Sequence, residues 1–304
     1  MRLARFLAAV GRTCITAGVL ILLFVAYQLW GTGLRAAQAQ NGLERDFTAI
    51  LEGTTTTSPT TSTTGAADPA STTTVAPTVP PIAPVAEGEA TAHITVPKIG
   101  LDWIVVEGIA LRDLKKGPGH YAQTPLPGQR GNAAIAGHRT TYGAPFNRID
   151  ELVPGDEIQV ETVQGTFTYI VKEQQIVSPT QVDVIDDKGD NRLTLTACHP
   201  KYSARQRIVV VATLAADEVP LPPSLPPSDA AEPAPKELTT IGGAGAPAAP
   251  AIALGAACAA IWLLAWLVGR AWRRWPAYLL GLPVFLVALF FFFEEFSRLL
   301  PSDF

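Results

Sequence analysis

Three long apolar runs flank or follow a central stretch of short alternating runs. The first covers residues 13–34 and carries no charge, the second covers residues 249–269, and the third covers residues 276–293. A helix that crosses a bilayer needs about 20 apolar residues. Each run therefore predicts a transmembrane helix, and the last two predict a membrane hairpin.

The arginines around these runs predict the orientation of the chain. Three precede the first run within residues 1–12, and three lie in residues 270–275 between the last two runs. Basic residues stay on the cytoplasmic side, which places the region between the first two runs, and residues 294–304, outside a cytoplasmic membrane. A signal peptide cleaved near Ala37–Ala39 is the alternative, but the first apolar run is longer than such peptides usually have.

Two polar segments separate the membrane runs from the central domain. The first segment covers residues 35–92, and from residue 53 onward Thr, Ser, Pro, Ala and Gly dominate it. The second covers residues 216–248 and is rich in Pro and Ala. Such compositions bury too little apolar surface to offset the entropy of ordering. We interpret them as a disordered stalk and a linker, which leaves residues 93–215 as the folded domain.

The folded domain alternates short β-type runs with turn signals. Examples are HITVPKI, DWIVVEGI, NAAIAGH, RLTLTAC and RQRIVVVATL. Short helices fit only near residues 145–152 and 180–186. Strands at this density predict an all-β fold, a closed antiparallel barrel or a sandwich. The barrel is favoured because closure removes exposed strand edges.

Charge adds one exclusion. The chain has 23 basic and 27 acidic residues, a formal net charge of −4. Binding to a phosphate backbone requires a basic surface, so the sequence gives no indication of a nucleic-acid partner.

One cysteine stands out from the other two. Cys14 and Cys258 lie in apolar membrane runs, where cysteine behaves as a small hydrophobic residue. Cys198 has no second cysteine in the external domain with which to form a disulfide. It ends a strong strand pattern just before His199-Pro200, which predicts an exposed strand end. Cys198 is therefore a candidate nucleophile.

A thiol attacks as the thiolate, which a neighbouring cation favours. His138 ends the strand-like run NAAIAG, in the same strand-to-loop position as Cys198. Arg207 opens the next strand, nine residues after Cys198, and a hairpin would bring it back beside the sulfur to stabilise an oxyanion. Arg205 is the competing arginine. His199 is interpreted as a loop histidine, because neighbours on a strand point to opposite faces.

Two segments carry a resemblance to a known family. The sequence GHRTTYGAPFNRIDEL at residues 137–152, with TLTACHPKYSARQRIVVVA at residues 194–212, resembles the sortase family, most of all its actinobacterial class E. The resemblance spans the external domain. It implies a closed eight-stranded β-barrel and a cysteine transpeptidase whose catalytic residues are Cys198, His138 and Arg207.

The resemblance also implies substrate contacts. Tyr142 matches a tyrosine typical of class E and implies a C-terminal sorting signal of the LAxTG type over LPxTG. Sortases commonly have threonine just before the cysteine, where this chain has Ala197, with Thr196 one residue earlier. Tyr142, Thr196 and Ala197 are therefore the candidate substrate-binding residues, and Ala197 lacks the hydroxyl that the family pattern has at this position.

The implied partners are secreted proteins with sorting signals, a cell-wall or pilin amine as acceptor, and the membrane. The chemistry needs no metal or cofactor, and the acidic stretch at residues 183–190 lacks the spacing of an EF-hand calcium loop. Two alternatives remain. One is another cysteine transpeptidase of the cell wall, although an SHGC-type signature is absent, and the other is a non-catalytic surface scaffold.

Overall fold

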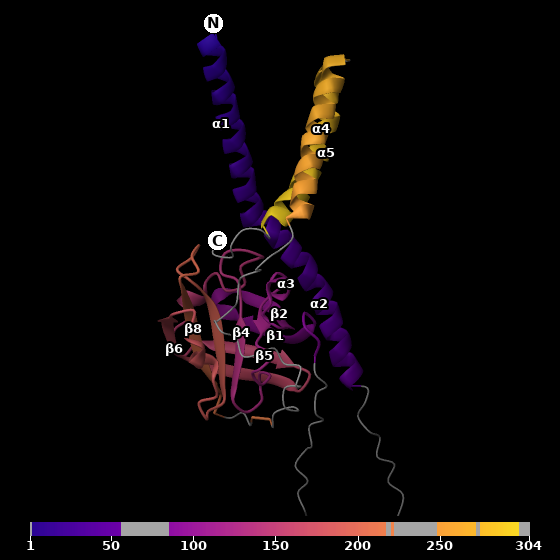
Figure 1. The fold of residues 1–304 in the computed structure, drawn as a ribbon. Coiled ribbons are helices and arrows are strands. Elements are labelled where there is room, and N and C mark those ends of the chain that lie inside the picture. The colour runs from indigo at the N-terminus through magenta and orange to yellow at the C-terminus, as the bar shows by residue number, and fades with distance from the viewer. Residues whose placement is uncertain (1, 56–84, 217–219, 222–247, 272–273, 298–304) are drawn as a thin grey trace, which may run out of the picture. The chain divides into compact units, whose positions relative to one another are not determined.

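The computed structural model describes residues 2–55, 85–216, 220–221, 248–271 and 274–297 (Figure 1). These fall into two compact units, residues 35–240 and residues 1–34 with 241–304. The larger unit contains eight strands that close into a barrel in the order β1-β2-β3-β4-β7-β8-β6-β5. This confirms the predicted all-β barrel.

The strands and short helices of the barrel unit follow one another along the chain. The strands are β1 (Ala90–Val96), β2 (Leu101–Glu107), β3 (Gly119–His120), β4 (Asn132–Ala136), β5 (Glu157–Thr162), β6 (Gly165–Val177), β7 (Arg192–His199) and β8 (Gln206–Leu214). The helices are α2 (Thr32–Thr55, most of which belongs to this unit), α3 (Leu111–Leu114) and the 3₁₀ turns η2 (Pro97–Ile99), η3 (Ile149–Glu151) and η4 (Val182–Ile185).

Two strand pairs differ from the antiparallel pattern expected from the sequence. β2 pairs with β3 and β4 pairs with β7 in parallel, while the other pairs are antiparallel. The β4–β7 register runs from Asn132 opposite Arg192 to Ala136 opposite Thr196. The expectation of a purely antiparallel barrel was therefore wrong. Parallel neighbours cannot be joined by a hairpin, so longer crossover connections link these strands.

The alternation of side chains separates two hydrophobic clusters. Leu193, Leu195 and Ala197 of β7 join the large cluster to which every strand but β3 contributes, and this cluster fills the barrel interior. Thr194 and Thr196 point to the opposite face, because successive side chains of a strand alternate. A second cluster covers that outer face under the loop after β3 and under η4. Residues of β7 with even numbers thus belong to the outer face of the barrel.

The predicted stalk at residues 35–92 is wrong at both ends. Residues 35–55 belong to α2, which packs Leu43 and Phe47 against Ile104 and Val106 of β2. Gln40 in α2 accepts a hydrogen bond from the backbone N–H of Ile104 at 2.8 Å. At the other end β1 begins at Ala90. Residues 56–84, the Thr-rich part of the predicted stalk, lie outside the described residues.

The predicted linker at residues 216–248 begins with a contact to the barrel. Leu221 pairs with Gln129, and its backbone N–H donates to the carbonyl of Gly128 at 2.9 Å. Residues 217–219 and 222–247 of this linker lie outside the described residues.

The second unit contains three long helices, α1 (Arg2–Ala26), α4 (Ala249–Ala271) and α5 (Arg274–Ser297), and the π-helical turn η1 (Tyr27–Gly31). Among the described residues, Ala249–Ala271 and Leu279–Ser297 are long and apolar enough to cross a membrane. The apolar helical part near the N-terminus, Cys14–Ala26, is shorter. Residues 272–273 of the predicted basic turn and residues 298–304 of the predicted external end lie outside the described residues.

Candidate active site

Cys198 lies at the end of β7, on the outer face of the barrel. It is half-buried and is one of the free cysteines. Its side chain belongs to the face of Thr194 and Thr196, because these residues are spaced by two along the strand. The structure therefore has Cys198 at the end of a strand, as the sequence predicted.

Arg207 is the direct cross-strand partner of Cys198 in the antiparallel β7–β8 pair. The Cβ atoms of two such residues lie about 4.5–5.5 Å apart on one face of the sheet. Arg207 is 3% exposed, and its Nη1 donates to the backbone carbonyls of Ala204 at 2.7 Å and Gln206 at 3.0 Å. Arg205, the competing arginine, precedes β8 and is exposed.

His138 comes two residues after β4, level with Cys198 across the parallel β4–β7 pair. Ala136 is opposite Thr196, and the backbone N–H of Gly137 donates to the carbonyl of Thr196 at 3.0 Å. Two further residues along each chain lead to His138 and Cys198. The register thus brings the two strand ends together, as the sequence predicted.

The imidazole of His138 is buried, and its Nε2 has no hydrogen-bond partner among the described residues. Burial, with a smaller contribution from the charge of Lys115, lowers the pKa of His138 from 6.5 to about 4. Both effects penalise the imidazolium form. His138 is therefore neutral at pH 7 in this state of the protein.

Tyr142 lies beside His138, as its place in the same loop suggested. The ring centroids of the two residues are 5.0 Å apart. Tyr142 has a φ of 51°, in the left-handed region that non-glycine residues rarely adopt. The ammonium of Lys115 is 5.4 Å from the centre of the Tyr142 ring, within the range of a cation–π contact. Lys115 is a member of this cluster that sequence reasoning missed.

The remaining two candidate substrate-binding residues, Ala197 and Thr196, are both buried. Ala197 belongs to the interior cluster and is 2% exposed, so it faces away from Cys198. We correct the expectation that Ala197 contacts substrate, because a side chain at this position points into the barrel. Thr196 is on the face of Cys198 but is fully buried, where its Oγ1 lies 3.2 Å from the hydroxyl of Tyr121.

His199 is not the exposed loop histidine that the sequence suggested, because it is the half-buried last residue of β7. Its Nδ1 lies 3.2 Å from Nη1 of Arg139, the residue that follows His138. Arg139 stands inside the segment GHRTTYGAPFNRIDEL, which carries the family resemblance. Its buried position follows only from the fold.

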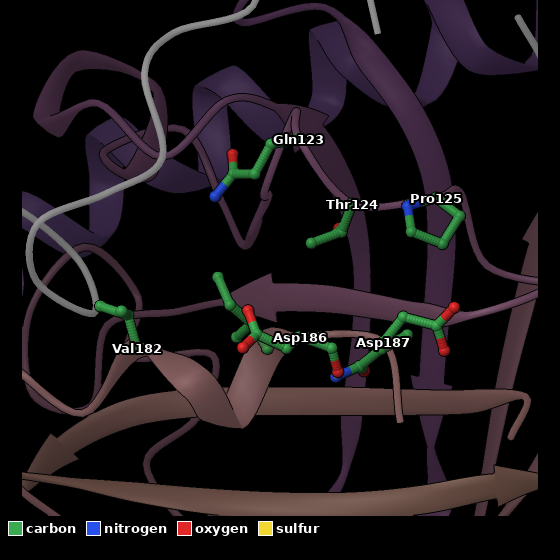
Figure 2. A pocket seen from close by; sticks show the side chains of 8 residues that line it. Gln123, Thr124, Pro125, Val182, Asp186 and Asp187 are labelled. Carbon is green, nitrogen blue, oxygen red and sulfur yellow. The ribbon is translucent and has the colours of Figure 1, made fainter. Parts of the chain in front are cut away.

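A pocket of about 230 Å³ opens on the outer face of the barrel, at the Asn132 end of β4. Figure 2 shows Gln123, Thr124 and Pro125 on one side of it and Val182, Asp186 and Asp187 on the other. Asn132 is six residues before His138, which corresponds to about 20 Å of extended strand. The pocket therefore lies along the outer face, on the amino-terminal side of the paired strand ends.

Asn132 connects the pocket wall to the two strands that carry His138 and Cys198. Its Nδ2 donates to the backbone carbonyls of Val184 at 3.1 Å and Asp186 at 3.0 Å. Its Oδ1 accepts from the hydroxyl of Thr194 at 2.7 Å. The polar side chain is 1% exposed but fully hydrogen-bonded, which removes the cost of burying it.

Comparison with known proteins agrees with the fold. Residues 94–215 match the sortase domain family. This domain, which contains the eight strands of the barrel except the first residues of β1, belongs to the sortase family. It is 34% identical over 222 residues to Sortase SrtE1 of Streptomyces coelicolor, an alignment that covers 66% of this chain and 55% of SrtE1. A class E sortase is thus among its relatives, as the sequence implied.

Two further relatives extend the comparison. Sortase D of Bacillus subtilis is 34% identical over 114 residues, covering 37% of this chain and 56% of that protein. The solved structure of sortase E from Streptomyces avermitilis is 38% identical, with 43% of this chain and 91% of that chain covered and a TM-score of 0.39. The chain spans little more than half the length of SrtE1 and of Sortase D.

Proposed function

We propose that the protein is a cysteine transpeptidase that cleaves a C-terminal sorting signal and transfers the cleaved protein to an amine. The observation that carries this proposal is the register of three strands. The proposal is supported by the pairing of Cys198 with Arg207 in β7–β8 and of Ala136, two residues before His138, with Thr196 in β4–β7. A thiol nucleophile, an acid–base group and a fixed cation are the parts that acyl transfer requires.

The first half-reaction forms a thioester. The thiolate of Cys198 attacks the carbonyl carbon of the threonine in the signal, and the guanidinium of Arg207 stabilises the oxyanion. The C–N bond to glycine then breaks as the imidazole, having taken the thiol proton, returns it to the departing amine. In the second half-reaction an amine attacks the thioester, loses a proton to His138 and expels the thiolate.

The substrate class follows from the neighbourhood of His138. We propose an LAxTG-type signal, because Tyr142 lies against the His138 ring and matches a tyrosine typical of class E. The acceptor is proposed to be a cell-wall or pilin amine.

The proposed location is the outer side of a cytoplasmic membrane. The apolar helices Ala249–Ala271 and Leu279–Ser297 support a membrane hairpin, and the predicted N-terminal anchor would make a third span. Arg270 and Arg274 stand at the turn between α4 and α5, where a cytoplasmic turn carries basic residues.

The test uses the full chain in detergent with an LAxTG peptide and an amine acceptor, and mass spectrometry of the products. Joined product should form, and Cys198→Ala should abolish it. Arg207→Ala should lower kcat by about 10²–10³, the loss that follows removal of an oxyanion donor. The matched control Arg205→Ala should keep most of the activity, because Arg205 is exposed and precedes β8.

Each outcome has a definite meaning. Product formation by Cys198→Ala would exclude the thioester mechanism. Absence of cleavage across LAxTG, LPxTG and related peptides would favour the scaffold alternative. Loss of activity in Arg205→Ala but not in Arg207→Ala would move the oxyanion role to Arg205. Better turnover of LPxTG than of LAxTG would contradict the role given to Tyr142.

A further inference from the structure

Arg139 is a buried cation next to the proposed catalytic residues. The proposed mechanism gives it no role. It follows His138 in the chain, and its side chain is 2% exposed. A buried guanidinium is costly unless it is paired and hydrogen-bonded. The contacts that compensate it therefore indicate what the residue does.

The guanidinium joins two segments that are far apart in the sequence. Its Nη1 donates to the backbone carbonyl of Cys198 at 3.4 Å and to Nδ1 of His199 at 3.2 Å. Its Nη2 forms an ion pair with Oδ2 of Asp150 at 2.7 Å. Because arginine is a donor only, Nδ1 of His199 acts as the acceptor in this arrangement. Arg139 thus contacts the backbone of the nucleophile itself.

The backbone of Arg139 is held as well. Its carbonyl accepts a hydrogen bond from Nδ2 of Asn147 at 3.0 Å, and Oδ1 of Asn147 accepts one from Nζ of Lys201 at 3.3 Å. Lys201 belongs to the loop that follows Cys198. The loop after β4 is therefore connected to the end of β7 through the guanidinium and to the loop after β7 through Asn147.

Asp150 fixes the orientation of the guanidinium. Burial by itself would raise the pKa of Asp150, but the hydrogen bond and the charge of Arg139 outweigh burial and hold that pKa below its ordinary value. The carboxylate is 42% exposed, so the pair is partly screened by solvent. Its importance is geometric, since a planar guanidinium bound on one side can present its other edge only in one direction.

We propose that Arg139 is a positioning residue of the transpeptidase site: its guanidinium fixes the Cys198 end of β7 against the His138 loop, and its charge favours the Cys198 thiolate. This inference rests on the proposed function for its effect on turnover. Its effect on the thiol does not depend on turnover, because a cation near a cysteine favours the thiolate whether or not a substrate binds.

The test measures the rate of alkylation of Cys198 by iodoacetamide between pH 5 and 10 in the full chain. Mass spectrometry of the peptide that contains Cys198 separates its signal from those of Cys14 and Cys258. Arg139→Gln removes the cation and should move the midpoint of the pH profile upward by about one pH unit, with a large loss of kcat. Arg148→Gln is the matched control, because Arg148 is an exposed arginine of the same loop that pairs with Glu151.

Two further variants separate charge from geometry. Arg139→Lys keeps the cation but loses the planar fork, so it should restore most of the alkylation profile and little of kcat. Asp150→Asn leaves Arg139 charged but weakens its orientation, so it should lower kcat with little change in the profile. These two variants also carry the test if Arg139→Gln does not fold.

The inference is overturned if Arg139→Gln folds and its alkylation profile coincides with that of Arg148→Gln. It is also overturned if Arg139→Lys and Asp150→Asn both turn over substrate at the parent rate. A protein that shows the predicted alkylation profiles but cleaves no sorting peptide would instead contradict the proposed function and leave the effect of Arg139 on Cys198 standing.

Discussion

The protonation state of His138 allows the sharpest prediction about this site. Its pKa lies near 4 instead of 6.5, a gap of about 2.5 pH units. At about 1.4 kcal/mol per unit, the folded protein disfavours the imidazolium by roughly 3 kcal/mol. At pH 7 about one molecule in a thousand carries the proton on His138. His138 is therefore a neutral imidazole at this pH, the form that accepts the thiol proton in the proposed mechanism.

The perturbation is Lys115→Met, which removes the second cause of the low pKa and leaves burial, the first cause, in place. The pKa of His138 should rise, but not as far as 6.5. Lys116→Met is the matched control, because the ammonium of Lys116 donates to the carbonyl of Gly88 and no effect of it on His138 is expected. The measurement is an NMR titration of the full chain with labelled histidine, in which His138→Gln assigns the signal among the four histidines.

The same shift predicts how stability depends on pH. The unfolded chain takes up this proton below about pH 6.5, whereas the folded chain does so only near pH 4. The contribution of His138 to the free energy of unfolding is thus fully present above pH 6.5. As the pH falls towards 4, the protein loses up to about 3 kcal/mol of this free energy. His120 acts in the opposite sense: burial lowers its pKa, but Glu107, 3.0 Å away, raises it above 6.5 overall. The difference between the parent and His138→Gln isolates the effect of His138.

A titration midpoint of His138 at or above 6.5 would refute this reasoning. So would equal shifts in Lys115→Met and Lys116→Met, because the effect would then come from net charge and not from the lysine near the Tyr142 ring. A free energy of unfolding with the same pH dependence in the parent and in His138→Gln would refute the linkage argument.

Two other predictions concern the loop before His138 and the membrane helices. A Cβ at Gly137 would lie 2.6 Å from the buried ring of Phe146, so Gly137→Ala should destabilise the protein by about 1–3 kcal/mol and impair turnover. Gly42→Ala, in a helix with open space around it, should stabilise by up to about 1 kcal/mol, and thermal unfolding with an activity assay checks both. Alkaline phosphatase, which is active only after export, should be inactive when fused after Arg274 and active after Ser297, and the reverse result would invert the proposed orientation.

The sequence was informative where local pattern decides the structure. Alternation over RLTLTAC and RQRIVVVATL predicted two strands, and a spacing of nine residues predicted that Arg207 folds back beside Cys198, which the β7–β8 register confirms. The strand-end position of His138 predicted its neighbourhood in the same way. These features depend on residues close in sequence or on the end of one strand.

Features that depend on distant packing were missed. Nothing local in residues 35–55 shows that Leu43 and Phe47 have a partner in β2, so a polar helix was interpreted as part of a stalk. The face of Ala197 follows from strand alternation, but which face is the barrel interior follows only from closure. Arg139 was passed over because its burial depends on Asp150 and on the end of β7.

The parallel pairing of β4 with β7 has a consequence for the order in which the proposed catalytic residues come together during folding. Ala136 and Thr196 are paired although they are far apart in the sequence, whereas Cys198 and Arg207 are joined by a hairpin. Contacts between distant residues form slowly, because the chain between them must first be ordered. We therefore expect the β7–β8 hairpin, which pairs Cys198 with Arg207, to form before β4 pairs with β7 and brings His138 to the same strand end. On the proposed mechanism, a molecule with an unclosed barrel would lack its acid–base group and would not yet react.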